Sequence, residues 1–399
     1  DTPDHEYSDN VTIHWKVWYK VNPEDEWVVV QEGVGGKEQD VTITLANDSY
    51  HLVEYWAVDA CEWEETHHFE LDIIDDRAPV LVKDIGDPKV SVGAGEWYIT
   101  QNTMITLNCV DQCPHPSNHE TIYYRYNVDG GPYTGWIVYE GPFHFTEDSL
   151  HRLEYKCVDA LENVAGPYIE YDYVDTVPPT TTKTYGTPYY TDGTRKWITS
   201  STPITLTATD GGAICAVDNV KTYYMNTVLY GEDQLMCEYP EKFCHAIHNY
   251  ESSGWTLYTG PFYKSEESCH LIEYWSVDAL GNKEQIKAQC VYVDNSPPQT
   301  TKTVGTPRYE GTGDIDWWIT QQTLITLSCI DQEPHPANNV TLYYRDYLDG
   351  AAPPAFTAVP GGYVEIRKGE DCKHRLEWYC VDALGNSEGS AEKPIIEID

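Results

Sequence analysis

The segment HRLEYKCVDALEN, residues 151–163, has three near copies elsewhere in the chain. They read HLVEYWAVDA at 51–60, HLIEYWSVDALGN at 270–282 and HRLEWYCVDALGN at 374–386. The shared VDA tripeptide ends at Ala60, Ala160, Ala279 and Ala383, so the copies are 100, 119 and 104 residues apart. These periods exceed the roughly 20–50 residues of solenoid repeats and match β-sandwich domains of about 100 residues. The spacing therefore predicts a row of such domains.

Other segments recur in the same order around each copy. A Pro-Thr linker at 76–88, 175–188 and 294–307 comes before a Trp-led segment such as WITSSTPITLTATD, and a Tyr-rich segment such as TIYYRYNVDG follows. Alternating apolar and polar residues, rich in β-branched and aromatic types and bounded by Gly and Pro, indicate strands. We therefore predict an all-β chain of tandem immunoglobulin-like (Ig-like) β-sandwich domains arranged as an elongated rod.

The repeats place the predicted domains at 1–75, 76–174, 175–293 and 294–399. The third is the longest because it carries an insertion near 231–254. The first is truncated, since NVTIHWKVWYKVN from Asn10 already matches the Tyr-rich segment and no linker or first long strand comes before it. Either the chain begins within a domain, or another chain supplies the missing strands.

The cysteine pattern predicts two bridges between sheets. Twelve cysteines, an even number, indicate disulfides. Cys109 and Cys157 of the second domain match Cys329 and Cys380 of the fourth. The third domain has Ala208 and Ser276 there, so both cysteines are present or absent together. We therefore predict the bridges Cys109–Cys157 and Cys329–Cys380, as in an immunoglobulin-type sandwich.

The other cysteines allow several arrangements. Cys269 and Cys290 would face each other across the last hairpin of the third domain, and Cys237 and Cys244 would close the insertion. A zinc site of Cys237, Cys244, His245 and His248 is the alternative, but its spacing matches no common zinc pattern, and a disulfide loop is favoured. Four cysteines have no evident local partner and could pair between domains or between subunits: Cys61, Cys113, Cys215 and Cys372.

A tyrosine stands two residues before the cysteine position in three copies, at Tyr55, Tyr155 and Tyr274. This spacing is typical of a tyrosine corner, in which the ring is buried and its hydroxyl caps the backbone upstream. The fourth copy has Trp378 there, so we do not expect the hydroxyl contact in that domain.

Four motifs together identify a kind of repeat. They are the Pro-Pro-Thr linker, the WITxxTPITLTATD strand, the TGPF turn and the EYxxVDALGN hairpin. In these the chain resembles the tandem Ig-like repeats of secreted and cell-surface proteins from archaea and bacteria, the archaeal repeats most of all. The resemblance covers nearly the whole chain and is specific for the repeat rather than for a function. It implies a stalk, an adhesin arm, or a subunit of a surface layer or filament.

Aspartates recur at three positions of each complete copy, at the start of the linker, after the Trp-led strand and after the VDA strand. In this type of sandwich the three positions lie at the end where the linker enters, so the carboxylates should converge at each domain junction. Carboxylate oxygens suit Ca²⁺, and the alternative is that each aspartate caps a tight turn. The candidate ligands are Asp76, Asp111, Asp159, Asp175, Asp210, Asp278, Asp294, Asp331 and Asp382.

Charge and motifs exclude several function classes. The formal net charge is −40, which argues against nucleic acid as a partner, because binding phosphates needs a basic surface. No run approaches the length of an apolar membrane span, and no GxSxG, HExxH or P-loop motif occurs, so we expect neither a membrane span nor an enzyme. Three sequons, at Asn10, Asn47 and Asn339, could carry N-linked glycans outside the cell.

Three functions remain. The first is an extracellular structural subunit that self-assembles into a filament, sheath or surface layer, with strand addition at the truncated domain and head-to-tail contact. The second is an adhesin or binding arm that recognises a glycan or a protein. The third is a non-catalytic piece of a larger surface enzyme. Apart from Ca²⁺, we expect no cofactor.

Overall fold

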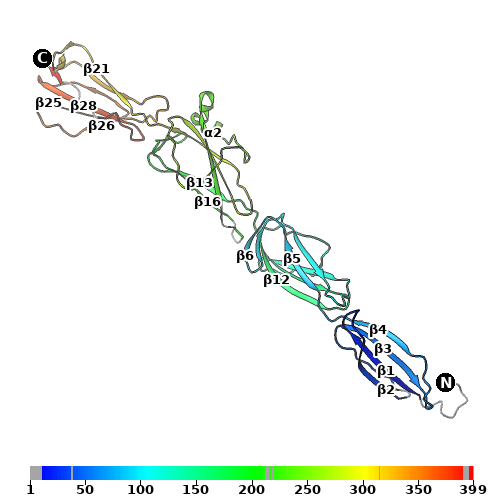
Figure 1. The fold of residues 1–399 in the computed structure, drawn as a ribbon. Coiled ribbons are helices and arrows are strands. Elements are labelled where there is room, and N and C mark those ends of the chain that lie inside the picture. Colours follow the sequence, from blue (N-terminus) through cyan, green and yellow to red (C-terminus); the bar gives the residue numbers. More distant parts are fainter. Residues whose placement is uncertain are drawn as a thin grey trace. The chain divides into compact units, whose positions relative to one another are not determined.

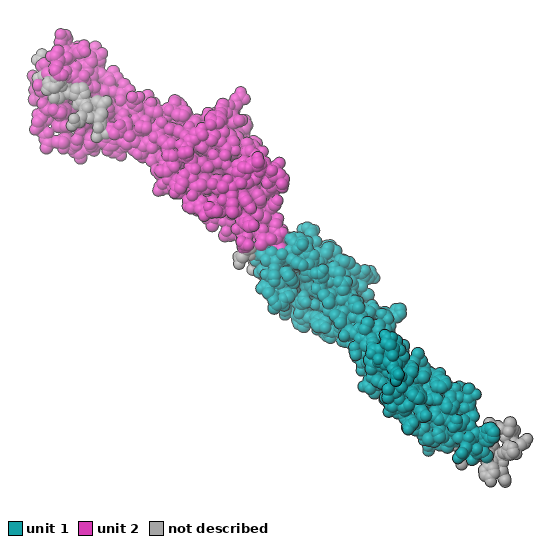
Figure 2. Space-filling model, viewed as in Figure 1, with its two compact units in different colours: residues 1–177, 212–217 teal, residues 178–211, 218–399 magenta. Residues whose placement is uncertain are grey.

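A computed structural model describes residues 11–36, 39–211, 215–217, 219–313, 315–389 and 395–398. The chain forms two compact units (Figures 1 and 2). Unit 1 contains residues 1–177 with 212–217, and unit 2 contains 178–211 with 218–399. Nearly all regular structure is strand, which confirms the all-β prediction. No helix among the described residues is long and apolar enough to cross a membrane.

The first repeat is a single four-stranded sheet with the order β2-β1-β3-β4. Its strands are β1 (Thr12–Lys20), β2 (Val28–Gly35), β3 (Ser49–Val58) and β4 (His68–Ile74). All three neighbouring pairs are antiparallel. Among the described residues, no second sheet packs on this one, which agrees with the predicted lack of leading strands.

The second repeat is a two-sheet sandwich. Its smaller sheet pairs β5 (Val80–Ile85) with β8 (Ile105–Val110), and its larger sheet has the order β10-β9-β11-β12-β7-β6. The larger sheet contains β6 (Lys89–Gly93), β7 (Glu96–Ile99), β9 (Thr121–Val128), β10 (Ile137–Val138), β11 (Leu150–Val158) and β12 (Val164–Val174). Along β11 the residues His151, Leu153, Tyr155 and Cys157 are buried, because alternate side chains of a strand point to the same face.

The third repeat has the same arrangement, with β13-β16 as its smaller sheet and β14-β15-β20-β19-β17-β18 as its larger sheet. The strands are β13 (Thr180–Tyr185), β14 (Tyr189–Thr191), β15 (Lys196–Ile198), β16 (Ile204–Thr209), β17 (Lys221–Leu229), β18 (Thr256–Leu257), β19 (Cys269–Val277) and β20 (Lys287–Val293). The insertion forms a 3-10 turn, η1 (Gly231–Gln234), and two short helices, α1 (Leu235–Glu238) and α2 (Pro240–Phe243).

The fourth repeat has a three-stranded sheet β21-β24-β27 and a larger sheet β22-β23-β29-β28-β25-β26. The strands are β21 (Gln299–Val304), β22 (Arg308–Glu310), β23 (Ile315–Ile319), β24 (Ile325–Ile330), β25 (Thr341–Leu348), β26 (Thr357–Pro360), β27 (Tyr363–Ile366), β28 (Lys373–Val381) and β29 (Ile395–Ile398). In all three complete repeats the Trp-led strand pairs in parallel with the last strand.

Four disulfides join eight of the twelve cysteines. The bridges Cys109–Cys157 and Cys329–Cys380 link the two sheets of their sandwiches, as predicted. The predicted local pairs in the third repeat are wrong, since Cys237 bonds to Cys269 and Cys244 bonds to Cys290. Cys269 lies opposite Tyr292, not Cys290. Each strand cysteine instead fastens the insertion to the larger sheet, which also excludes the zinc alternative for Cys237 and Cys244.

Candidate functional sites at the domain junctions

Three carboxylates converge where the first and second repeats meet. Asp75 follows β4, Asp111 follows β8 and Asp159 follows β11. One oxygen of each lies within 4.8 Å of one from each of the other two, and all three residues are buried. The register of the sandwich brings these strand ends to one place, as the sequence predicted. The linker residue is Asp75, however, and not Asp76, which is exposed.

The same arrangement recurs in unit 2, where the third and fourth repeats meet. Asp294, Asp331 and Asp382 are buried, and their oxygens also lie within 4.8 Å of one another. Burial is the main cause that raises the pKa of Asp294 to about 7; the charges of Asp331 and Asp382 also raise it, and hydrogen bonds from Ala337 and Ser296 lower it. Burial likewise raises the pKa of Asp331.

Each of these carboxylates also accepts a hydrogen bond from a backbone N–H group one or two residues later in the chain. Asp159 Oδ1 accepts the backbone N–H groups of Leu161 at 2.8 Å and Asn163 at 2.9 Å. Asp382 does the same for Leu384 and Asn386, both at 2.8 Å. The turn-capping alternative is therefore confirmed for the VDA aspartates. Although burial opposes ionisation, the hydrogen bonds from Asn163 and Leu161 lower the pKa of Asp159.

In each cluster the linker aspartate and the aspartate that follows β8 or β24 accept hydrogen bonds from adjacent backbone N–H groups of one loop. Asp75 Oδ2 accepts Ser117 N–H at 2.9 Å and Asp111 Oδ2 accepts Asn118 N–H at 3.0 Å. In unit 2, Asp294 Oδ2 accepts Ala337 N–H and Asp331 Oδ2 accepts Asn338 N–H, both at 2.8 Å. Each cluster thus ties the linker and two loops together at one junction.

The clusters lack an internal counter-charge. None of the ion pairs in the described part of the chain joins any of the six carboxylates to Lys, Arg or His. Three buried carboxylates within 4.8 Å repel one another unless one is protonated or a cation binds between them. Carboxylate oxygens are the ligands that Ca²⁺ prefers, so the residues fit that ion. The remaining set of predicted Ca²⁺ ligands is divided between the two units, with Asp175 in unit 1 and Asp210 and Asp278 in unit 2. Calcium binding by this set stays a prediction.

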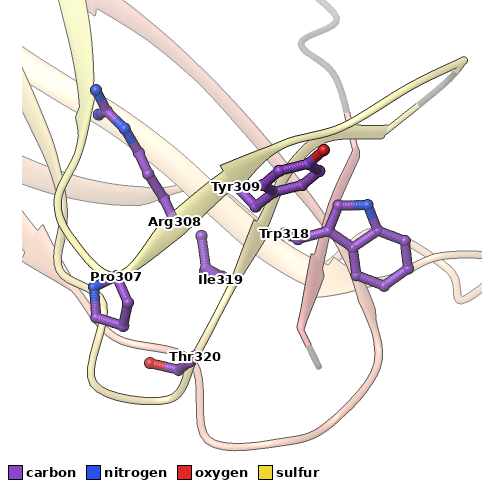
Figure 3. A pocket seen from close by; sticks show the side chains of 6 residues that line it. All are labelled: Pro307, Arg308, Tyr309, Trp318, Ile319 and Thr320. Atoms are coloured by element: carbon purple, nitrogen blue, oxygen red, sulfur yellow. The ribbon is translucent and has the colours of Figure 1, made fainter.

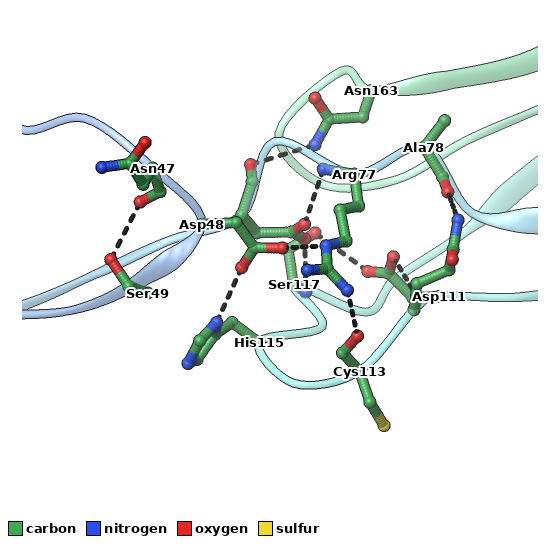
Figure 4. Close-up of polar contacts among 12 residues, drawn as sticks. Asn47, Asp48, Ser49, Arg77, Ala78, Asp111, Cys113, His115, Ser117 and Asn163 are labelled. Atoms are coloured by element: carbon green, nitrogen blue, oxygen red, sulfur yellow. Dashed lines mark hydrogen bonds and ion pairs between the residues drawn. The ribbon is translucent and has the colours of Figure 1, made fainter. Parts of the chain in front are cut away.

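A second polar contact secures the first junction (Figure 4). Asp48, in the loop before β3, lies between His115 and Arg77, as Figure 4 shows. His115 donates from Nδ1 to Asp48 Oδ1 at 2.7 Å and packs edge-on against Tyr50. Arg77 forms an ion pair with Asp48 and donates to the Cys113 carbonyl at 2.8 Å. The His115 side chain is fully buried.

Two other buried residues occupy this position in the later repeats. His335 stacks on Tyr292 in unit 2, with ring centroids 5.0 Å apart. Val217 donates its N–H to Asp175, just as Ser117 donates its N–H to Asp75. Cys215 stands two residues before Val217, and therefore at the position that His115 has relative to Ser117. Burial, with a contribution from Asp148, raises the pKa of Cys215 to about 12. The shared Pro-His-Pro at 114–116 and 334–336 is the sequence signal for this position in the second and fourth repeats.

We expect Asp48→Ala to destabilise the first junction. The substitution leaves the buried His115 N–H without its acceptor, at a cost of about 1–3 kcal/mol. Calorimetry of the full chain should show one transition at a lower temperature and the others unchanged. Asp40→Ala, at an exposed position, is the control, and equal melting of the two variants would contradict the role assigned to Asp48.

The remaining predicted positions have varied surroundings. Asn47 and Asn339 are exposed, and Asn10 lies outside the described residues. His248 contacts Glu273. Cys61, Cys113, Cys215 and Cys372 form no disulfide within the described chain. The tyrosine-corner prediction is wrong for Tyr155, whose hydroxyl donates to the Glu170 side chain at 2.6 Å instead of to the backbone.

The first repeat presents a core face that is only partly covered, because Val17, opposite Val53 on this face, is buried whereas Tyr55 is exposed. Tyr55 is 39% exposed, whereas its counterparts Tyr155, Tyr274 and Trp378 are 3–5% exposed. Val53 and Ala57 are half-buried, although Leu153 and Cys157 at the same positions are fully buried. In the second repeat these side chains pack against residues of β5 and β8, such as Leu81 and Leu107. β4 is also an edge strand, whereas its counterpart β12 pairs with β7.

The chain was compared with protein families, curated proteins and solved structures. No protein-family model and no curated protein matches the chain. The FN1–FN3 domains of chicken CNTN1 are similar over 80% of this chain and 98% of theirs, at 8% identity and a TM-score of 0.25. The three N-terminal domains of the highly immunogenic outer capsid protein of bacteriophage RB49 are similar over 81% of this chain and 99% of theirs, at 11% identity and a TM-score of 0.34. The strand topology shows the fold: the chain is a series of tandem Ig-like domains, of which the last three are complete β-sandwiches and the first has a single sheet among its described residues.

Proposed function

We propose that this chain is an extracellular structural subunit that assembles with copies of itself into a filament, sheath or surface layer. Tandem Ig-like domains fit a structural or binding role outside the cell, and four disulfides are typical of oxidising surroundings. The observation that carries the proposal is the partly exposed core face of the first repeat, on which Tyr55 is 39% exposed.

Strands from a neighbouring subunit would cover that face. In the complete repeats two elements do so: an antiparallel strand pair packs on the face, and a Trp-led strand pairs in parallel with the last strand. An edge strand beside an exposed core face favours strand addition. Head-to-tail contacts produce an open fibre when the rotation between successive subunits does not close a ring.

Electron microscopy of the purified chain tests the proposal. We expect ordered fibres or sheets from the wild-type chain and dispersed particles from Tyr55→Asp, because a charge on the face opposes burial. Phe69→Asp is the matched control, since Phe69 is 59% exposed and lies opposite Glu54, on the other face of the sheet. Dispersed wild-type monomers would refute the assembly, and fibres from Tyr55→Asp would refute strand addition.

The junction clusters would bind Ca²⁺ and hold successive domains together. Their support is the convergence of three buried carboxylates without a cationic side chain, at two junctions. N-linked glycans at the exposed Asn47 and Asn339 would suit the same extracellular setting. We propose no enzymatic activity toward another molecule.

An adhesin is the second candidate, favoured by exposed aromatic side chains. Tyr309 on β22 and Trp318 on β23 are cross-strand neighbours and line a shallow pocket of about 270 Å³ with Pro307, Arg308, Ile319 and Thr320 (Figure 3). Tyr309 is 75% exposed. Such rings suit stacking against a sugar. Dispersed monomers that bind a glycan array through Tyr309 would favour this function over assembly.

A further inference from the structure

A buried lysine and two carboxylates meet inside the second repeat. Lys83 lies on β5, the first strand, and Asp172 and Glu170 lie on β12, the last strand. Lys83 Nζ is 2.7 Å and 2.9 Å from the two Asp172 oxygens and 2.9 Å from Glu170 Oε2. The Lys83 side chain is 2% exposed and that of Asp172 is 0% exposed.

We propose that Lys83 and Asp172 form an intramolecular amide bond, with Glu170 as the group that transfers protons. The cross-link would join the first and last strands of the repeat covalently. It goes beyond the assembly proposed above and does not depend on it.

The site favours this condensation in three ways. First, the fold holds amine and carboxyl group in contact, which replaces a bimolecular encounter. Second, an ion pair with almost no access to water is costly, and a neutral amide removes both charges. Third, burial raises the pKa of Asp172 more than the charge of Lys83 lowers it, which favours the neutral acid that condensation requires.

The bond changes balance without another reactant. A proton passes from the Lys83 ammonium to the Asp172 carboxylate, which leaves a neutral amine and a carboxylic acid. The Nζ lone pair then attacks Cγ of Asp172 and forms the C–N bond. Glu170 accepts a second proton from Nζ and returns it to the departing hydroxyl. The C–O bond breaks, one water leaves, nothing is oxidised or reduced, and Glu170 ends unchanged.

A hydrogen bond positions the proton-transfer group. Tyr155 on β11 donates from its hydroxyl to Glu170 Oε1 at 2.6 Å, which leaves Oε2 toward Lys83. Burial and this hydrogen bond raise the pKa of Tyr155, so the hydroxyl remains a donor. This contact explains why Tyr155 departs from the expected backbone cap.

The third repeat is an internal control. Lys183 occupies the position of Lys83, because both lie three residues before the Gly that follows the strand, Gly186 and Gly86. The strand register puts Gln289 in the place of Glu170 and Val291 in the place of Asp172. The Lys183 amine is buried with no hydrogen-bond partner in the described structure, so this repeat has an amine and no acceptor. It should form no cross-link.

Mass spectrometry of the reduced, denatured full chain, expressed without glycosylation, tests the proposal. We expect a mass lower than the sequence mass by one water, and a branched tryptic peptide that joins Lys83 to Asp172. Lys183 should appear in linear peptides only. Full sequence mass with Lys83 and Asp172 in separate linear peptides would overturn the proposal.

Three variants separate bond formation from folding. Lys83→Arg keeps the charge pair and should retain the full sequence mass. Glu170→Gln keeps both reacting groups and should also retain the full mass, and a cross-link in this variant would overturn the role of Glu170. Asp172→Asn should form the same bond with loss of ammonia instead of water, a signature that an ordinary buried ion pair does not produce. Circular dichroism of each variant reports whether it folds.

Discussion

Removal of the Cys109–Cys157 bridge, by Cys109→Ala with Cys157→Ala, should destabilise the second repeat by about 4 kcal/mol. The two cysteines are 48 residues apart, and a closed loop of that length restricts the unfolded chain by about this amount. In calorimetry of the full chain, one transition should move down by roughly 20 °C, given about 4–8 °C per kcal/mol for a domain of this size.

The proposed amide bond should change how much the loss of this disulfide lowers the melting temperature. A Lys83–Asp172 link would restrict the same unfolded chain, so loss of the disulfide should have a larger effect in a Lys83→Arg background. The control is Cys113→Ser, because Cys113 is exposed and forms no disulfide. An unshifted transition in the double alanine variant in both backgrounds would show that the bridge adds nothing to stability.

The third repeat shows what replaces a disulfide at this position. Ser276, at the position of Cys157, is within hydrogen-bond distance of the Thr181 hydroxyl at 2.5 Å and the Thr222 hydroxyl at 2.8 Å. Thr181 also donates its N–H to Glu284 at 3.0 Å. A buried polar network thus joins the sheets where the covalent bond is absent, which agrees with the joint loss of both cysteines.

Repetition explains why much of the architecture and of the junction clusters was predictable. The VDA strand, the Trp-led strand and the linker recur in fixed order, and strand register then places their terminal aspartates together. The prediction of Asp76 is wrong because the equivalent linker position is one residue earlier, at Asp75. Counting back four residues from Pro79, Pro179 and Pro298 identifies Asp75, Asp175 and Asp294.

Features without a repeated counterpart were the ones that the sequence could not place. The insertion occurs once, so no second copy showed that Cys237 and Cys244 reach strand partners instead of each other. Lys83 and Asp172 are 89 residues apart, and their contact depends on two strands from opposite ends of the repeat. The repeats also differ at this site, since Gln289 and Val291 replace both acids in the third.

The same register has a consequence for the first repeat. Glu70 pairs opposite Val53 and Asp72 opposite His51, the positions of Glu170 and Asp172 in the second repeat. The acidic pair is therefore present in the first repeat, whose described residues include no counterpart of the lysine-bearing strand. A covering strand with a lysine at the position of Lys83 would complete the same set of groups, so strand addition and cross-linking would use one chemistry.

Calcium should stabilise the junction of Asp294, Asp331 and Asp382, and its effect should depend on pH. The pKa of Asp294 is raised from 3.8 to about 7 in the folded chain. The folded state therefore holds a proton that the unfolded state releases, and the stability from this proton is fully present below pH 3.8 and lost as pH rises to about 7. In EDTA, the melting temperature of this junction should fall across that interval.

Calcium should reverse that loss above the interval. At a concentration one hundred times its dissociation constant, a bound ion adds about 2.7 kcal/mol, so the transition at pH 7.5 should move up with Ca²⁺. Near pH 4 the ion should have little effect, because the proton occupies the site. Asp331→Asn should abolish the shift, and Glu310→Gln, at an exposed position, should preserve it. Equal melting in EDTA and in Ca²⁺ at pH 7.5 would mean that protonation and the backbone N–H groups alone balance these three charges.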